Sequence, residues 1–242
     1  MLLQKFKSFA HRLLAVAAYW LYGRPSRKLV VIGVTGTKGK TTTCRFIAEV
    51  LESAGYRVGL LSTAEFQIGE RRWLNDKKMT MLGRGQIQSM LRRMVNKKCT
   101  HVVIETSSEG ILQCRHYGLN YDVAVFTNLG TEHSERHGGY ENLRADKGRM
   151  FAALVGKRKK LQGKIIPKIS IVNGDSEEAG FFLSSWADKK YLFTLAPDHP
   201  PHEGAEVVAG RIESQLHGFM VDNDLFQLRL LGKFNVENAL AA

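Results

Sequence analysis

Apolar positions along the chain follow two different spacings, and together they predict an α/β fold. Unbroken runs of β-branched and other apolar residues are typical of buried strands; they cover 28–34, 57–62, 101–105 and 121–127. Apolar residues at every third or fourth position are typical of one face of a helix; they occur in 41–54, 86–95 and 143–154. Strands that alternate with helices predict a doubly wound, mostly parallel sheet.

The pattern changes beyond Lys164. One more buried strand is expected at 169–173, followed by short apolar segments that Pro, Gly, Asp and Asn separate; these segments are 191–194, 205–212, 219–221 and 225–231. They predict a small antiparallel region near the C-terminus. We expect residues 66–82 to be irregular and a helix to begin at Val236.

Residues 1–25 predict an amphipathic helix, separate from a domain over 26–242. Apolar residues recur at helical spacing, and Lys5, Lys7 and Arg12 add basic charge. The apolar stretch is too short to span a bilayer, and no signal-peptide cleavage site follows it. Two alternatives stay open: residues 2–22 dock on the protein's own body, or they contact the inner membrane surface.

A glycine-punctuated turn follows the first predicted strand, and it is typical of a phosphate-binding loop. Residues 30–43 read VVIGVTGTKGKTTT. Glycines leave room for backbone N–H groups to approach phosphate; they are Gly33, Gly36 and Gly39. Lys40 can reach terminal phosphates, and the Thr41 hydroxyl can bind Mg²⁺. The commonest spacing has a glycine where this chain has Val34. The sequence predicts ATP or GTP binding.

Polar side chains follow two later strands. Glu105 ends one and Asn128 follows another, so both are expected beside the loop at the carboxyl ends of the sheet. A carboxylate there suits Mg²⁺. His133 and His137, taken alone, are expected on a surface loop, and Lys147 on a helix is expected to be solvated.

The net charge and the cysteines limit the partners and the kinds of site that we expect. The net charge of +12 fits anionic ligands, but no RNA-binding motif accompanies it, so nucleic acid is not expected as a partner. The three cysteines stand singly, which indicates reduced thiols in a cytoplasmic protein rather than zinc or disulfide sites.

Several motifs, in their order along the chain, resemble the Mur ligases. They are GTKGKTT at 36–42, ETSS at 105–108, FTNL at 126–129, Glu132-His133, Lys147, and GKFNVENALAA at 232–242. The run 105–137 is most similar to the tripeptide synthetases of this family, which add the third residue of the peptidoglycan stem peptide. The resemblance extends from about residue 28 to the end and implies the family's central ATP-binding domain.

The resemblance implies a role for particular residues. ATP binding is implied for Gly36, Thr37, Lys38, Gly39, Lys40, Thr41, Thr42, Asn128 and Asn238. Two Mg²⁺ sites are implied, one at Thr41 and Glu105 and the other at His133 and a carbamylated Lys147. Lys40, His133 and Lys147 would be catalytic. Ser107 and Arg115 would contact the muramoyl-peptide substrate.

The implied activity is ATP-dependent amide-bond formation through an acyl phosphate, joining an amino acid to a UDP-N-acetylmuramoyl-peptide. The chain departs from the family in three places: Glu132 replaces Asp, Glu109 replaces His, and Thr80-Met81-Leu82 replaces Thr-Thr-Pro. These departures keep two alternatives open. One is a ligase for another carboxylate, such as poly-γ-glutamate or a lipid-linked cell-wall precursor. The other is a nucleotide-binding module without catalysis of its own.

The family's other domains are expected to be absent from this chain. Fewer than thirty residues precede the first strand, too few for the domain that grips the UDP group. The chain ends where the C-terminal ligase domain would begin. We therefore expect weak nucleotide binding and little or no ligation by this chain alone.

Overall fold

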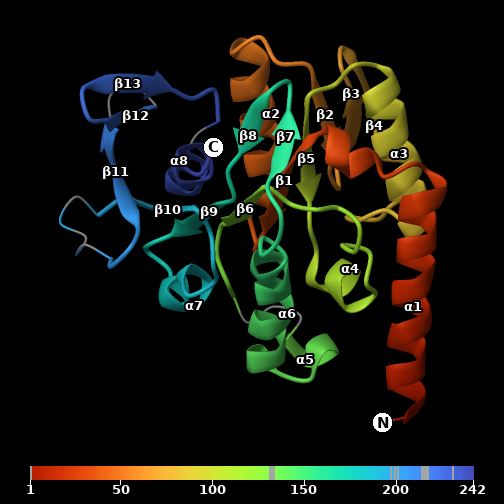
Figure 1. Ribbon diagram of the computed structural model, residues 1–242. Helices are drawn as coiled ribbons and strands as arrows, with labels where there is room; N and C mark the ends of the chain where they lie inside the picture. Colours follow the sequence, from red (N-terminus) through yellow and green to blue (C-terminus); the bar gives the residue numbers. More distant parts are fainter. Residues whose placement is uncertain are drawn as a thin grey trace.

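One large, mostly parallel sheet forms the centre of the computed structural model, which describes residues 2–130, 134–196, 198, 200, 202–213, 218–230 and 232–242 (Figure 1). Across these residues the strand order is β13-β12-β11-β10-β9-β6-β1-β5-β2-β3-β4. The strands are β1 Val30–Thr35, β2 Val58–Leu61, β3 Glu65–Ile68, β4 Arg71–Leu74, β5 His101–Glu105, β6 Val123–Phe126, β9 Ile169–Asn173, β10 Lys189–Thr194, β11 Glu206–Glu213, β12 Gly218–Val221 and β13 Asp224–Gln227. A separate hairpin joins β7 Lys159–Leu161 to β8 Lys164–Ile166.

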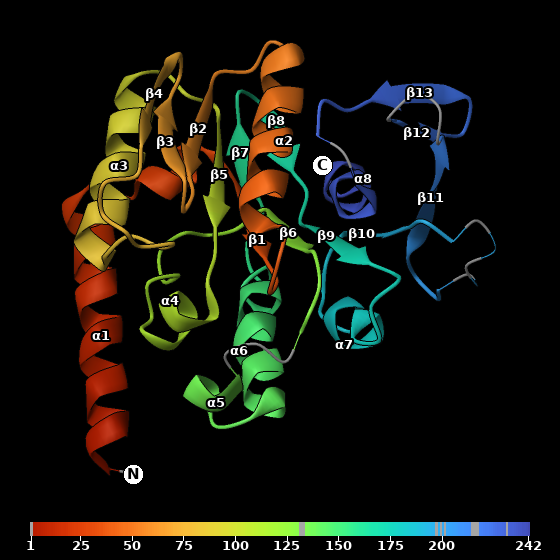
Figure 2. The same ribbon diagram turned by 180° about the vertical axis from the view of Figure 1, so that it is seen from behind.

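Helices cover both faces of the sheet because successive strand residues point to opposite sides. On one face Val31 and Phe126 pack with residues of α3, α6 and α7. On the other face Ile32 and Val125 pack with α2 and α8, which Figure 2 shows in front of the sheet. The helices are α1 Leu2–Leu21, α2 Lys40–Ser53, α3 Arg84–Asn96, α4 Ser108–Leu112, α5 Ser134–His137, α6 Tyr140–Ala152, α7 Ala179–Leu183 and α8 Lys233–Leu240, with a 3-10 turn, η1, at Pro25–Lys28. The predicted fold class is confirmed.

Helix α1 lies along α3 at the edge of the molecule (Figure 1). Ala15 and Ala18 of α1 are buried, and the Arg92 guanidinium of α3 donates to the Tyr22 carbonyl at 2.7 Å. Among the described residues, no helix is long and apolar enough to cross a membrane. The contact with α3 shows that α1 packs on the protein's own body, while much of its apolar surface faces outward.

Three strand predictions were wrong in detail. The segment expected to be irregular contains the β3–β4 hairpin, which turns at Gly69 with a φ of 60°. Its alternation is hard to read because β4 is solvent-facing and begins with two arginines. Strands β10 and β11 continue the parallel sheet, and only β12 and β13 are antiparallel in this region. Strand β13 ends at Gln227, earlier than expected.

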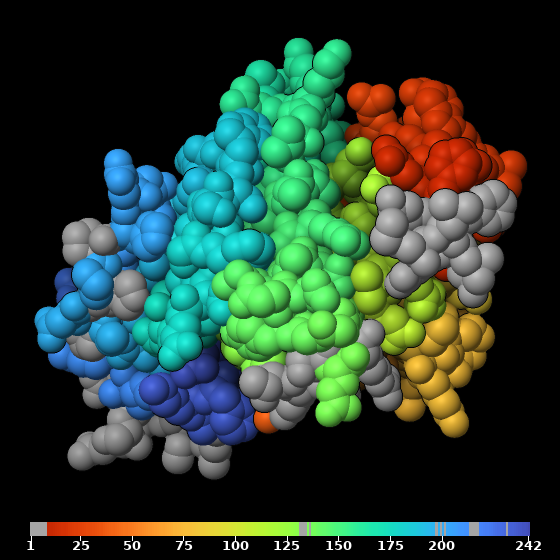
Figure 3. Space-filling view, turned by 90° about the horizontal axis from the view of Figure 1, so that it is seen from below, coloured from red at the N-terminus to blue at the C-terminus, as the bar shows by residue number. Residues whose placement is uncertain are grey.

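The topology places three loops at one edge of the sheet. Strand β1 lies between β5 and β6, and all three run parallel. Their carboxyl ends are therefore adjacent, at the point where the strand order reverses, which is where ligands bind in doubly wound folds. Figure 3 looks onto this edge, where α5 and α6 (green) lie between the C-terminal segment (blue) and α1 (red).

Candidate functional site

The loop between β1 and α2 is shaped by two glycines that no other residue could replace without movement. Gly36 has a φ of 153°, and a Cβ there would lie 2.0 Å from the Thr127 hydroxyl oxygen. Gly39 has a φ of 81°, and a Cβ would lie 2.1 Å from Asn238 Oδ1. Gly33, expected to help form the phosphate cradle, instead lies within β1 and makes room for Tyr121 and Met150.

The segment after β6 fixes the conformation of this loop. The Thr37 and Lys38 amides donate to the carbonyl and the Oδ1 of Asn128, each at 2.9 Å. Asn128 Nδ2 donates to the Lys38 carbonyl at 3.1 Å, and the Thr127 hydroxyl donates to the same carbonyl at 2.8 Å. Asn128 therefore holds the backbone of the loop in place, a role that its sequence position alone did not reveal.

Glu105 ends β5 beside the first turn of α2, and its carboxylate is oriented by three donors. The Thr41 hydroxyl donates to Oε2 at 2.9 Å, the Thr63 amide donates to Oε2 at 2.7 Å, and the Thr63 hydroxyl donates to Oε1 at 2.9 Å. Glu105 is 2% exposed. Sequence reasoning missed Thr63, although it lies just beyond the carboxyl end of β2, where site residues are expected.

Two lysines meet beside the loop. Lys40 Nζ donates to the Thr37 carbonyl and Lys147 Nζ donates to the Gly36 carbonyl, each at 2.8 Å. Lys147 is buried on α6 rather than solvated as expected. Burial, and secondly the charge of Lys40, lower the pKa of Lys147 from 10.5 to about 7, although Asp146 opposes the shift. Lys147 is thus partly a neutral amine near neutral pH.

A cavity of about 390 Å³ opens over these groups. Its lining includes Gly36, Thr37, Lys40, Thr80, Ser107 and Lys147. Backbone of a strand–helix turn, two amines and hydroxyl groups therefore converge on one space at the carboxyl edge of the sheet. Such an arrangement can hold a polyphosphate.

His137 also lines this cavity and is not the surface histidine that the sequence predicted. Its Nδ1 lies 2.8 Å from Asp146 Oδ2, and its Nε2 lies 3.0 Å from the Ser108 hydroxyl. The side chain is only 4% exposed. Asp146 also pairs with Arg149 at 3.1 Å. A buried carboxylate thus orients an imidazole toward the cavity, and no motif of the sequence had pointed to Asp146.

Three of the remaining predicted site residues make hydrogen bonds within the protein, and two are not described. Ser107 caps α4 by accepting from the Gly110 amide at 3.1 Å. The Arg115 guanidinium donates to Gln113 Oε1 and to the Met81 carbonyl, so it holds two neighbouring segments together. Asn238 on α8 touches the loop at Gly39 and accepts from the Thr43 hydroxyl at 3.3 Å. His133 and Glu132 lie outside the described residues.

The residues present fit one divalent cation of the oxygen-preferring kind. The Thr41 hydroxyl and the Glu105 carboxylate are adjacent, and both are ligand types that Mg²⁺ prefers. No group of three or more His, Cys, Asp and Glu side chains in the described ranges could hold a metal by itself. Mg²⁺ is usually bound by one or two protein ligands together with waters and substrate phosphates, and this pair of ligands suits that kind of site.

Comparisons with known proteins identify the family of this chain. Residues 34–242 match the model of the Mur ligase middle domain. The chain belongs to the Mur ligase family. It is 37% identical over 237 residues to a UDP-N-acetylmuramyl-tripeptide synthetase of Roseiflexus sp. (strain RS-1), covering 95% of this chain and 46% of the relative. The chain thus spans about half the length of that Mur ligase.

Solved structures of a Mur ligase and of a folylpolyglutamate synthase share the fold. A UDP-N-acetylmuramoyl-L-alanyl-D-glutamate–2,6-diaminopimelate ligase superposes with a TM-score of 0.71 at 27% identity, over 88% of this chain and 42% of that one. Folylpolyglutamate synthase of Mycobacterium tuberculosis, solved with ADP, superposes with a TM-score of 0.60 at 14% identity, over 95% of this chain and 56% of that one. The family resemblance and the fold expected from sequence are both confirmed.

Proposed function

We propose that this Mur ligase domain binds ATP and activates a carboxylate for amide-bond formation. The observation that carries the proposal is the convergence of Lys40 and Lys147 on one cavity at the carboxyl edge of the sheet, next to the turn of α2 where the Thr41 hydroxyl contacts Glu105. The carboxylate would belong to a UDP-N-acetylmuramoyl-peptide, and an amino acid would supply the amine. The relatives' names support this substrate class.

The loop residues Gly36 to Thr42 would bind the triphosphate. Two positive-φ glycines keep side chains away from the loop, and α2 begins at Lys40, so the positive end of a helix faces the phosphates. Lys40 would neutralise charge on the terminal phosphoryl group during its transfer. Stabilising this charge in the transition state is the largest catalytic contribution in such enzymes. Asn238, beside Gly39, would contact the nucleotide from α8.

Thr41 and Glu105 would hold the first Mg²⁺, and a carbamylated Lys147 together with His133 would hold the second. Bound Mg²⁺ supplies charge neutralisation between phosphate oxygens. The neutral amine of Lys147 suits carbamylation, because its nitrogen attacks CO₂ and releases one proton to form the carbamate. Its lowered pKa, about 7, makes this amine available at neutral pH.

The reaction would proceed in two steps. A substrate carboxylate oxygen attacks the γ-phosphorus, and ADP leaves to give an acyl phosphate. The incoming amine then attacks the acyl carbon, phosphate leaves, and the amine loses a proton. His137, which Asp146 orients and which lines the cavity, would accept the proton that the attacking amine loses.

A different carboxylate substrate is the second candidate. Arg115 is engaged by Gln113 and the Met81 carbonyl, and Thr80-Met81-Leu82 departs from the family sequence at this position. The role of Ser107 and Arg115 in substrate binding therefore depends on which carboxylate substrate the enzyme uses. Poly-γ-glutamate and lipid-linked cell-wall precursors are the alternatives, and a nucleotide-binding module without catalysis is a third.

Phosphate release measured with each acceptor tests the proposal. Release that requires ATP, Mg²⁺ and a UDP-muramoyl-dipeptide supports the first candidate, and release that requires a glutamate polymer or a lipid-linked precursor supports the second. Lys40→Ala should abolish release in both cases, whereas Lys164→Ala, an exposed lysine on β8, should not. ATP binding with no acceptor-dependent release would contradict both when it is measured in a protein that joins this domain to the other domains of its Mur ligase relatives.

We also propose that α1 contacts the surface of an anionic membrane. Its outward face is apolar, and the exposed side chains are Phe9, Leu13, Leu14, Trp20 and Leu21. Basic residues accompany them, and the Arg24 guanidinium lies 4.7 Å from the Trp20 ring centroid. An apolar face with flanking basic charge is typical of helices that lie in the membrane interface.

Sedimentation with vesicles tests this contact. Leu13→Glu should reduce binding to phosphatidylglycerol-containing vesicles, while Leu74→Glu, which changes an exposed apolar residue on β4, should leave binding unchanged. Equal sedimentation of both variants with the unaltered protein would contradict a role for α1 at the membrane.

A further inference from the structure

A second cavity, of about 400 Å³, lies at the opposite edge of the sheet from the nucleotide loop. It is formed where β1, β6 and β9 begin, beside η1 and the β7–β8 hairpin, which lies on the face of the sheet opposite to α2 (Figures 1 and 2). Six cationic side chains line it: Arg27, Lys157, Arg158, Lys159, Lys160 and Lys168. We call this cavity the basic pocket.

The floor of the basic pocket carries more positive than negative charge. Asp122 accepts from Lys159 Nζ at 2.5 Å and from Lys168 Nζ at 2.9 Å. The three side chains are 0%, 6% and 4% exposed, respectively. Two buried ammonium groups therefore share one carboxylate. A buried charge without a full counter-charge is costly, so an anion bound here would stabilise the arrangement.

The rim adds further cations without matching anions. Arg158 pairs with Asp188, but within the described ranges no carboxylate forms an ion pair with Arg27, Lys157 or Lys160. Burial is the largest cause that lowers the pKa of Lys159 to about 8, and the charges of Lys168 and Arg27 lower it further against Asp122. Lys159 remains mostly protonated at neutral pH, so the pocket keeps its positive charge.

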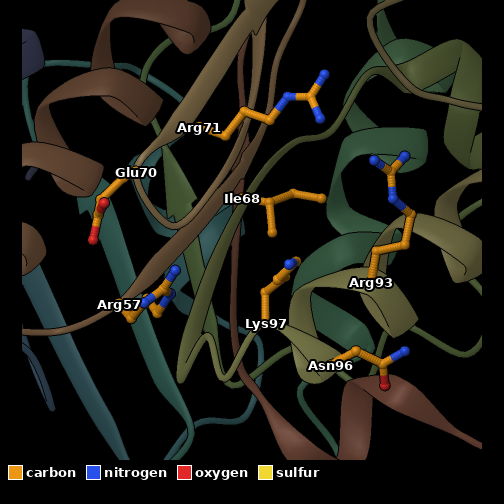
Figure 4. A pocket seen from close by; sticks show the side chains of 7 residues that line it. All are labelled: Arg57, Ile68, Glu70, Arg71, Arg93, Asn96 and Lys97. Carbon is orange, nitrogen blue, oxygen red and sulfur yellow. The ribbon is translucent and has the colours of Figure 1, made fainter.

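A third cavity of similar volume has basic side chains in its lining but lacks the buried positive charge of the basic pocket. It also measures about 400 Å³ and is lined by Arg57, Ile68, Glu70, Arg71, Arg93, Asn96 and Lys97 (Figure 4). There Glu70 lies among the cations, and none of the four basic side chains is buried. It therefore lacks the buried excess charge that distinguishes the basic pocket.

We propose that the basic pocket binds a phosphate group, as an anion site separate from the nucleotide loop. A phosphate carries up to two negative charges and several acceptor oxygens, so it can bind several lysines at once. Asn120 also lines the pocket, where its side-chain amide donates to the Ser26 hydroxyl and the Gly118 carbonyl and so fixes the neighbouring wall. The phosphate group belongs either to a free phosphorylated molecule or to a lipid head group. The lipid is a candidate because Tyr19 of α1, the helix proposed to contact the membrane, lines the pocket.

Inorganic pyrophosphate tests the free form. In a ¹⁵N NMR titration of the full chain we expect shifts at the Gly156 and Lys157 amides, separate from any at Gly36 and Gly39. The double variant Lys157→Gln/Lys160→Gln should bind pyrophosphate about tenfold more weakly at Gly156, which corresponds to about 1.4 kcal/mol for the two lost cation contacts together. The matched control Lys164→Gln/Lys189→Gln, which removes two exposed lysines elsewhere, should bind as the unaltered protein does.

Vesicles test the lipid form. In a Leu13→Glu background, which removes the proposed contact of α1, phosphatidylcholine vesicles with and without phosphatidylglycerol should still differ in sedimentation of the chain, and the double variant in the same background should lose that difference if the pocket binds a lipid phosphate. Pyrophosphate shifts confined to the nucleotide loop, together with vesicle binding that the double variant retains, would overturn the proposal. Lys40→Ala keeps the basic pocket intact, so these results do not depend on the proposed ligase activity.

Discussion

Lys147 makes a quantitative prediction about stability, because it is buried as an amine. Folding lowers its pKa from 10.5 to about 7, mainly through burial. Between these two values the unfolded chain binds a proton at Lys147 that the folded protein has lost. Unfolding therefore takes up a proton in this range, and this group makes the folded state more stable as the pH rises.

The magnitude follows from the size of the shift. Each unit of pKa difference corresponds to about 1.4 kcal/mol, and between about pH 6 and pH 9 the linkage amounts to about 2 to 3 kcal/mol in the free energy of unfolding. Lys147→Met keeps the length of the side chain and removes the titration. The stability of the unaltered protein should therefore rise with pH more steeply than that of the variant, by this amount.

Urea unfolding in CO₂-free buffers at both pH values measures the difference. Lys164→Met, an exposed lysine on β8, serves as the control and should follow the pH dependence of the unaltered protein. If Lys147→Met and the unaltered protein gain the same stability between the two pH values, the amine is not desolvated as described. The reasoning for carbamylation at neutral pH would then fail as well.

Three further substitutions have defined outcomes. Gly39→Ala would place a Cβ 2.1 Å from Asn238 Oδ1 at a positive φ; it should cost about 1 to 3 kcal/mol in urea unfolding and weaken ATP binding in calorimetry, and unchanged values for both would contradict the loop geometry. Glu105→Gln should weaken Mg²⁺-dependent nucleotide binding by about 10- to 100-fold while leaving metal-free binding unchanged, and an equal loss in both would argue against a metal role. Asp122→Asn leaves two buried ammonium groups without a counter-charge and should lower the free energy of unfolding by about 3 to 5 kcal/mol; a thermal or urea midpoint like that of the unaltered protein would contradict the charge balance of the basic pocket.

The central sheet and the nucleotide loop could be read from the sequence because both depend on local patterns. Buried parallel strands are continuous apolar runs, and the loop needs glycine at Gly36 and Gly39 for steric reasons that the motif records. The β3–β4 hairpin could not be read in the same way. Its outer strand faces solvent and begins with Arg71, so a polar segment hides a paired strand.

The supporting contacts of the site were beyond reach for a different reason. Asn128 and Thr63 act through tertiary contacts with segments distant in the sequence. Asp146 contacts His137, which lies nine residues earlier on the preceding helix. A lysine on a helix gives no signal of its own burial, and Lys147 was recognised only through the family resemblance. The buried pair of Lys159 and Lys168 on Asp122 is likewise a product of topology, since three separate segments meet there.

A crystal structure of the chain with a non-hydrolysable ATP analogue and Mg²⁺ tests the central claim most directly. We expect the γ-phosphate to lie beside Lys40 and Lys147 and the cation to be bound by the Thr41 hydroxyl and the Glu105 carboxylate. A nucleotide bound elsewhere, or a triphosphate in the loop whose cation is not bound by Thr41 and Glu105, would contradict it.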